Sequence, residues 1–216
     1  LLGPVAAPRR IVGVENSVTQ LAAFAEGGVR LSPKLVVNIG ARVDFTRLVG
    51  EARDGQPGMG EPNRTDVAFL PSLSFNWRAR EWLTAYVRYQ EGYRPGGLSV
   101  AEGIGNVRRF LGDDLSTVEG GIRLGDPARG PFDGAISLAW AHWEDIQADL
   151  VDRAGLPFTA NIGTGRVLNA EARIGWRPIA GLRIEAGAFA NDSALSHPAP
   201  AFARARVAEL PNVARL

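Results

Sequence analysis

Hydrophobic and polar side chains alternate along this chain with a period of two residues. Between 167 and 176 the apolar series is Leu168, Ala170, Ala172, Ile174 and Trp176, and the intervening series is Val167, Asn169, Glu171, Arg173 and Gly175. The alternation breaks over 177–181 and resumes over 182–191. Because successive side chains of a β-strand point to opposite faces, the pattern predicts two strands, each with one apolar and one charged face.

The same test predicts eight strands in the whole chain. They cover Gln20–Leu31, Lys34–Thr46, Ala68–Arg78, Trp82–Gln90, Ser116–Leu124, Phe132–Gln147, 167–176 and 182–191. In the sixth strand the preferred apolar face carries Ile136, Leu138 and Trp140, with Ala139, Ala141 and Trp143 as the competing series. The pattern also permits a ninth strand that begins near Val207.

The connections between these strands alternate in length. The short ones are Ser32–Lys34, Ala79–Glu81, Gly125–Pro131 and Arg177–Gly181, and the long ones are 47–67, 93–115, 148–164 and the segment from Asp192 onward. Short turns at one end and long loops at the other are typical of a transmembrane β-barrel, with periplasmic turns and extracellular loops. Trp77, Trp82 and Trp176 lie next to short turns, and Phe45, Tyr89 and Tyr93 lie near the opposite strand ends. Two aromatic belts of this kind mark the two surfaces of a membrane.

Charge separates the two faces more sharply than hydrophobicity does. The apolar series of these strands contain no Asp, Glu, Lys or Arg. The other series hold Glu26, Arg30, Arg42, Asp44, Arg78, Arg88, Glu119, Arg123, Glu171, Arg173, Arg183 and Glu185. An arginine that faces lipid at the membrane centre costs about 2–4 kcal/mol, so a lipid-facing surface would be cleared of charge. A soluble sandwich with the apolar series in its core gives the same alternation, but the loop lengths and aromatic belts favour the barrel.

Composition narrows the functional classes. The 216 residues carry 24 Lys+Arg against 23 Asp+Glu, which gives no indication of a nucleic-acid partner. The absence of cysteine excludes disulfides, thiolate metal sites and a cysteine nucleophile, and no Gly-x-Ser-x-Gly motif occurs. The only histidines are His142 and His197, and we expect His142, beside Glu144 and Asp145, to be a rim residue rather than a metal ligand. We therefore expect neither an enzyme nor a cofactor.

Four stretches resemble the barrel of TonB-dependent outer-membrane receptors, a family that imports ferric siderophores, vitamin B12 and some glycans. They are QLAAFAEGGVRLSPKLVVNIGARVD at 20–44, PSLSFNWRAREWLTAYVRYQEGYRPGG at 71–97, ISLAWAHWEDIQ at 136–147 and NIGTGRVLNAEARIGWRPIAGLRIEAGAFANDSAL at 161–195. The characteristic elements are Gly-x-Arg, Glu-Gly-Tyr-Arg-Pro-Gly-Gly, Asp-Ile-Gln and Asn-x-Gly followed by Trp-x-Pro, and they occur in the family's order. The likeness extends from about Thr19 to Leu210.

The resemblance implies an all-β fold, an antiparallel up-and-down transmembrane barrel segment with about eight strands of a barrel of the 22-stranded type. Residues 1–216 are then one partial β-barrel domain, in which the family's plug domain and last strands are not seen. It further implies active uptake across the Gram-negative outer membrane, with membrane lipid, TonB (through the plug) and a metal chelate or other small nutrient as partners. Two alternatives are a complete small eight-stranded barrel with an adhesive or structural role and a soluble β-sandwich that binds a ligand.

Candidate site residues fall into two groups. The first is a ladder of charges on the barrel interior, which fixes strand register, holds a plug or lines a substrate path: Glu26, Arg42, Arg88, Glu119, Arg123, Glu171, Arg173, Arg183 and Glu185. If Trp176 pairs with Leu182, Arg173 faces Glu185 directly. The second group lies in or next to the long loops. Tyr93, Arg94, Arg108 and Arg109 are candidates for contact with an anionic chelate, and Trp143 is either an aromatic platform or a packing residue.

Overall fold

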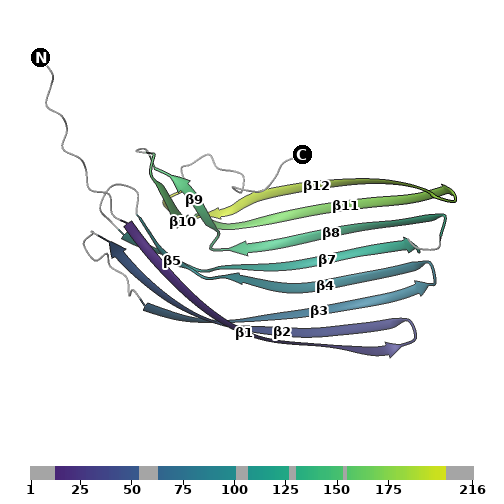
Figure 1. Ribbon diagram of the computed structural model, residues 1–216, viewed down its shortest axis with the longest axis horizontal. Coiled ribbons are helices and arrows are strands. Elements are labelled where there is room, and N and C mark those ends of the chain that lie inside the picture. The colour runs from purple at the N-terminus through teal and green to yellow at the C-terminus, as the bar shows by residue number, and fades with distance from the viewer. Residues whose placement is uncertain (1–12, 54–62, 101–106, 127–129, 153–154, 203–216) are drawn as a thin grey trace, which may run out of the picture.

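The computed structural model describes residues 13–53, 63–100, 107–126, 130–152 and 155–202. Eight strands form one antiparallel sheet in which each strand pairs with its neighbours in the order β1-β2-β3-β4-β7-β8-β11-β12 (Figure 1). Their bounds are β1 Gly13–Ser32, β2 Leu35–Arg53, β3 Asn63–Arg80, β4 Leu83–Arg94, β7 Asp113–Gly125, β8 Phe132–Glu144, β11 Gly163–Ile179 and β12 Leu182–Pro198. Among the described residues β1 and β12 are the two edges of this sheet.

Two further hairpins follow at one end of the sheet. The first consists of β5 (Gly97–Val100) and β6 (Val107–Phe110), and the second of β9 (Gln147–Val151) and β10 (Pro157–Asn161). We call this end the hairpin end, and the opposite end, where tight connections join the strands, the turn end (Figure 1). Within the described ranges no helix is long and apolar enough to cross a membrane.

All eight predicted strands are confirmed, but their bounds and the loops between them differ from the prediction. The strands run further toward the hairpin end: β2 continues past Thr46 to Arg53. The segments 93–115 and 148–164 are not plain loops, because each contains strands of one of the short hairpins. Strands of four or five residues are too short for a period-two test to separate from loop sequence. The possible strand near Val207 lies outside the described residues.

The sixth predicted strand is shorter than expected and its preferred face is confirmed. Strand β8 ends at Glu144 because Asp145 adopts a left-handed backbone (φ 49°) that redirects the chain, so that Gln147 begins β9 instead. In the register of β8 and β11, Trp140 stands opposite Leu168, which places the series of Trp140 on the apolar side.

The sheet has an apolar face and a polar face, as the alternation predicts. Cross-strand partners belong to the same series, for example Val43 with Phe69 and Ile122 with Ile136 on the apolar face. The side chains of this face are open, with Leu21 71% and Leu138 57% exposed. No second layer of the described chain covers the apolar face, which is contrary to what a soluble sandwich requires.

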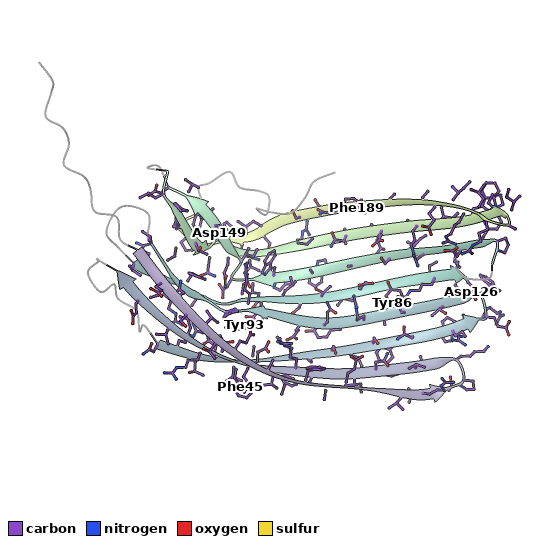
Figure 2. The ribbon with its side chains drawn as sticks, in the orientation of Figure 1. Phe45, Tyr86, Tyr93, Asp126, Asp149 and Phe189 are labelled. Atoms are coloured by element: carbon purple, nitrogen blue, oxygen red, sulfur yellow. The ribbon has the colours of Figure 1, made fainter. Side chains whose placement is uncertain are left out.

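Aromatic residues lie toward both ends of the strands. At the turn end the rings of Phe132 and Trp176 stack in parallel, with centroids 6.1 Å apart. Phe45 and Tyr93 lie toward the hairpin end, and Asp126 lies at the turn end (Figure 2). Aromatic side chains thus lie toward both ends of the strands, where the two belts were predicted.

The predicted register of the last hairpin is wrong. Strand β11 continues past Trp176 to Ile179, and a two-residue turn with Gly181 in the left-handed region (φ 84°) leads into β12. A register shift between Trp176 and Ile179 then pairs Trp176 with Ile184. As a result Arg173 stands opposite Gly187, and Glu185 stands opposite Gly175.

Candidate functional site

The two hairpins at the hairpin end fold against the main sheet and against each other. Strand β5 contacts β1 and β2, and β10 contacts β5 and β6. The contact is on the polar face, where Leu98 of β5 lies beside Gly50 of β2. On the same face of β2, Thr46 and Leu48 are buried. At this end of the sheet the polar face is therefore partly covered by the hairpin β5–β6.

Three amide side chains hold the hairpin β5–β6 by its main chain. Asn16 of β1 donates through Nδ2 to the Leu98 carbonyl (2.7 Å) and accepts from the Leu98 N–H (3.0 Å). Asn161 of β10 makes the same pair of bonds with Leu111, accepting from its N–H (2.6 Å) and donating to its carbonyl (3.1 Å). Each amide acts as a peptide group of a neighbouring strand would.

Gln147 supplies the third amide and joins the two stems of the hairpin. Its Nε2 lies 3.0 Å from the carbonyl oxygen of Pro95, before β5, and 2.9 Å from that of Leu111, after β6. The same nitrogen lies 3.4 Å from the Arg94 carbonyl. One side chain therefore closes the neck of the hairpin. We refer to Asn16, Gln147 and Asn161 together as the amide clasp.

An ion pair reinforces the neck below the amide clasp. Nη2 of Arg94 donates to Oδ2 of Asp113 at 2.5 Å and to the main-chain carbonyl of Gln147 at 3.1 Å. The Gln147 N–H donates to the same carboxylate at 3.2 Å. Asp113 is buried, so water does not solvate its carboxylate fully. Arg94 of β4 and the N–H of Gln147 in β9 stabilise the carboxylate instead. Arg94, a candidate for substrate contact, is placed at the base of the hairpin.

A small apolar core lies under the second hairpin. Ile146, Ala148 and Ile162 are buried, and Trp143 packs against them together with Leu150, Val167, Leu195 and Phe202. Trp143 therefore packs against this core, and its alternative role as an aromatic platform stays a prediction. The hairpin itself is pinned by a bond from Thr159 to Asp149 (2.7 Å; Asp149 is labelled in Figure 2).

The remaining loop candidates differ in their surroundings. The Tyr93 hydroxyl lies 3.3 Å from Oδ2 of Asp66 on β3, and its ring covers Gly112. Arg108 and Arg109 of β6 are exposed. Arg108 stands opposite Ser99, whose hydroxyl accepts a bond from the Thr159 N–H (2.7 Å). Arg108 and Arg109 follow one another on β6, so their exposed side chains leave opposite faces of the hairpin beside the amide clasp.

The predicted interior charges form two clusters on the polar face. In the middle of the wall, Glu119 of β7 accepts from the Tyr86 hydroxyl (2.5 Å) and from Arg88 (2.6 Å) of β4 (Tyr86 is labelled in Figure 2). The guanidinium of Arg123 lies 4.5 Å from the centre of the Tyr86 ring, a cation–π contact. Gly121 provides the space for this ring, because a Cβ there would come within 2.8 Å of it.

The second cluster lies at the turn end and spans three strands. Arg183 of β12 binds both oxygens of Asp133 on β8 (2.8 and 3.1 Å) across Gly175 of β11, and also Glu185 (2.7 Å). A Cβ at Gly175 would lie 2.5 Å from the Arg183 guanidinium, so the bridge requires glycine at this position. Asp133, which was not among the predicted charges, forms the cross-strand ion pair here with Arg183, whereas the predicted pair was Arg173 with Glu185.

The other ladder residues are placed on the same polar face. Arg42 pairs with Asp44 on its own strand (2.9 Å), Glu26 stands opposite Gly40, and Glu171 stands opposite Ser137. His142 lies 3.2 Å from Glu144 and stacks on Trp140. In the described ranges no three His, Asp or Glu side chains come together in a way that could hold a metal ion.

Sequence reasoning missed the amide clasp. Gln147 and Asn161 are the last and first residues of the Asp-Ile-Gln and Asn-x-Gly elements, but Asn16 lies outside every quoted stretch. The available signal was the position of these elements at strand ends, next to the Arg-Pro-Gly-Gly element that begins the hairpin. All three elements meet at one neck in the structure.

Comparisons with known proteins agree with this architecture. A family model described as TonB dependent receptor-like, beta-barrel, matches residues 4–215. The ferric yersiniabactin uptake receptor FyuA from Yersinia pestis is similar over 86% of this chain and 28% of its own, with a TM-score of 0.66 and 18% identity. The ferric preacinetobactin receptor BauA from Acinetobacter baumannii gives 0.61 and 17% over 84% of this chain and 26% of its own.

The copper transporter OprC gives a TM-score of 0.69 and 12% identity over 84% of this chain and 30% of its own. The chain spans less than a third of the length of these three structures. At such identities the likeness shows a shared fold. A search of curated proteins found no match.

Proposed function

Because this chain belongs to the TonB-dependent receptor β-barrel family, we propose that it forms part of the wall of an outer-membrane transporter that takes up a scarce nutrient such as a ferric siderophore, energised through TonB. The family consists of transport receptors of the Gram-negative outer membrane rather than enzymes. What we propose beyond membership of this family is the substrate class, the energy source and the role of each face of the sheet.

The observation that carries the proposal is the separation of the two faces of a single open sheet. In the strand interiors the apolar face carries no charged side chain and is exposed, so it fits contact with acyl chains. The charged residues that share this face, such as Arg47 and Arg166, lie toward the hairpin end. The polar face carries the two ionic clusters and fits a hydrated interior. The turn end would face the periplasm, and the hairpin end, with its longer connections, would face the outside, where substrate arrives.

The polar-face clusters have a role in this proposal. The Tyr86–Glu119–Arg88 cluster lies on the wall midway along the strands, where a plug or a passing substrate would meet it. We assign the ladder as a whole to the interior surface along which substrate passes. At the outer end, Arg108 and Arg109 would meet the substrate first.

Transport by the full-length receptor tests the proposal. The receptor is produced in a Gram-negative strain that lacks its own ferric-siderophore receptors, and cells are given ⁵⁵Fe bound to a tris-catecholate or to a tris-hydroxamate. Copper is tested alongside because one structural neighbour is a copper transporter. We expect accumulation of at least one probe that stops in a strain without TonB. Failure to accumulate any of them, or accumulation that does not depend on TonB, would refute the proposal.

A further inference from the structure

The amide clasp binds the hairpin β5–β6 only through main-chain atoms. Asn16 binds the peptide groups of Leu98, Asn161 binds those of Leu111, and Gln147 binds the carbonyls of Pro95 and Leu111. Every residue type except proline, which lacks the N–H, presents the same main-chain N–H and C=O groups. The clasp therefore fixes the path of the hairpin while its outward side chains are free to differ.

The clasp also joins separate parts of the molecule. Its members come from β1, β9 and β10, and they meet a hairpin that leaves the sheet after β4 and returns to it at β7. Nδ2 of Asn161 further donates to the carbonyl of Asp145 (2.5 Å), the left-handed residue that starts the second hairpin. Gln147 is the centre of the arrangement because it touches both stems of the first hairpin and is itself the first residue of the second.

The base of the hairpin β5–β6 is packed against its surroundings as well as held by hydrogen bonds. Val107 and Ser99 are buried, as are Gly96 and Gly97. A Cβ at Gly96 would come within 2.4 Å of the Phe110 carbonyl oxygen, so the two stems approach as closely as glycine allows. Arg108 and Arg109 remain exposed on this fixed base.

We propose that Asn16, Gln147 and Asn161 are positioning residues for a substrate-recognition arm, the hairpin β5–β6, on which Arg108 and Arg109 recognise an anionic metal chelate. This inference rests on the proposed transport function for the identity of the ligand, but the positioning itself does not. When guanidinium groups on a fixed backbone bind carboxylate or catecholate oxygens, the backbone part of the ordering cost has already been met. Without the clasp the same groups would be spread over many positions.

The positioning is tested by the mobility of the arm in the full-length receptor. The chain has no cysteine, so an Arg108→Cys substitution places a nitroxide spin label at one defined point of this chain. The spectrum of the label is compared in the otherwise unchanged receptor, in Gln147→Ala and in Gln147→Glu. The glutamate keeps the shape of the side chain but replaces the Nε2 donor by an acceptor oxygen, which cannot bond the three carbonyls. Gln90→Ala, an exposed glutamine on the polar face of β4, is the matched control. A second label at Leu138 of β8 reports on the wall.

We expect both substitutions at Gln147 to mobilise the label at position 108, the glutamate more than the alanine, while Gln90→Ala and the wall label show no change. An immobile label at 108 in both variants would overturn the proposal. If the variants at Gln147 do not assemble, Asn16→Ala and Asn161→Ala each remove one member of the clasp, and the same comparison decides.

Ligand recognition is tested separately by uptake of two ferric complexes, a triply anionic tris-catecholate and a neutral tris-hydroxamate. We expect Gln147→Ala to raise the apparent KM for the anionic complex by roughly ten- to a hundredfold with little effect on the amount of receptor in the membrane. Arg108→Ala with Arg109→Ala should remove the preference for the anionic complex. An unchanged KM and preference would refute the role of the arm. If no complex is transported at all, the transport function fails, and the label mobility still decides whether the clasp positions the arm.

Discussion

An arginine in the middle of the apolar face is expected to prevent stable insertion, whereas an arginine one residue away is expected to be tolerated. Leu138 is the seventh of the 13 residues of β8, is 57% exposed and stands opposite Gly120 and Ala170. These small neighbours cannot shield a long side chain. Ala139 lies on the polar face between Glu119 and Asn169, which can bind a guanidinium. Leu138→Arg and Ala139→Arg therefore form a matched pair.

The geometry of β8 sets the size of the effect. Thirteen residues at about 3.4 Å each give a strand of about 44 Å, which at a tilt near 45° crosses about 31 Å of membrane. Leu138 then lies close to the membrane centre, where an arginine costs about 2–4 kcal/mol. That cost corresponds to a roughly 30- to 1,000-fold fall in the equilibrium constant for folding into a bilayer.

The assay is the folding of full-length receptor into lipid vesicles over a range of urea concentrations, with the folded fraction measured by gel mobility without heating. We expect Leu138→Arg to move the midpoint to clearly lower urea and Ala139→Arg to stay near the unmodified receptor. Equal midpoints for the two variants, or a greater loss for Ala139→Arg, would refute the assignment of the apolar face to lipid. A soluble protein would tolerate Leu138→Arg, because that side chain already faces the solvent.

Three further outcomes follow from the structure. Receptor in which Trp140 is the sole tryptophan should lose fluorescence in vesicles of lipid with brominated acyl chains, and receptor with only Trp143 should not, since the two lie on opposite faces. Gly175→Ala should destabilise the receptor by about 1–3 kcal/mol in urea titrations, because the added methyl group meets the Arg183 guanidinium, whereas Gly187→Ala, with no atom closer than 3.6 Å, should be nearly neutral. Arg183→Lys should lower the midpoint of thermal unfolding, because an ammonium group cannot bind a carboxylate through two parallel bonds.

The face of each strand could be predicted from the sequence because period-two alternation acts on every residue. A charge on the apolar side is penalised throughout the membrane interior, so the signal accumulates along the middle of each strand and over eight strands. The strand around Trp140 and Trp143 was ambiguous by itself, and its observed pairing with the apolar series of β7 and β11 confirms the face that was preferred for Trp140.

Register and local hairpins could not be predicted in this way. The pairing of Arg173 depended on how the chain turns after Trp176, and a bulge with a left-handed Gly181 moved it by two residues while leaving every side chain on its expected face. Alternation does not detect such a shift, because a displacement by two preserves the faces. The same shift leaves Gly175 beneath the bridge between Arg183 and Asp133.

The amide clasp was invisible for a different reason. Its bonds join side chains to main-chain atoms, so the residues that it holds, Leu98 and Leu111, carry no polar group that marks them in the sequence. In each contact only the side-chain partner can be recognised from the residue type, and that partner is a single amide near a strand end. The resemblance located two of these amides, Gln147 and Asn161, as parts of separate signature elements. In the structure these elements meet at one neck, where the Gln147 amide bonds a carbonyl on each stem of the hairpin that follows Arg-Pro-Gly-Gly.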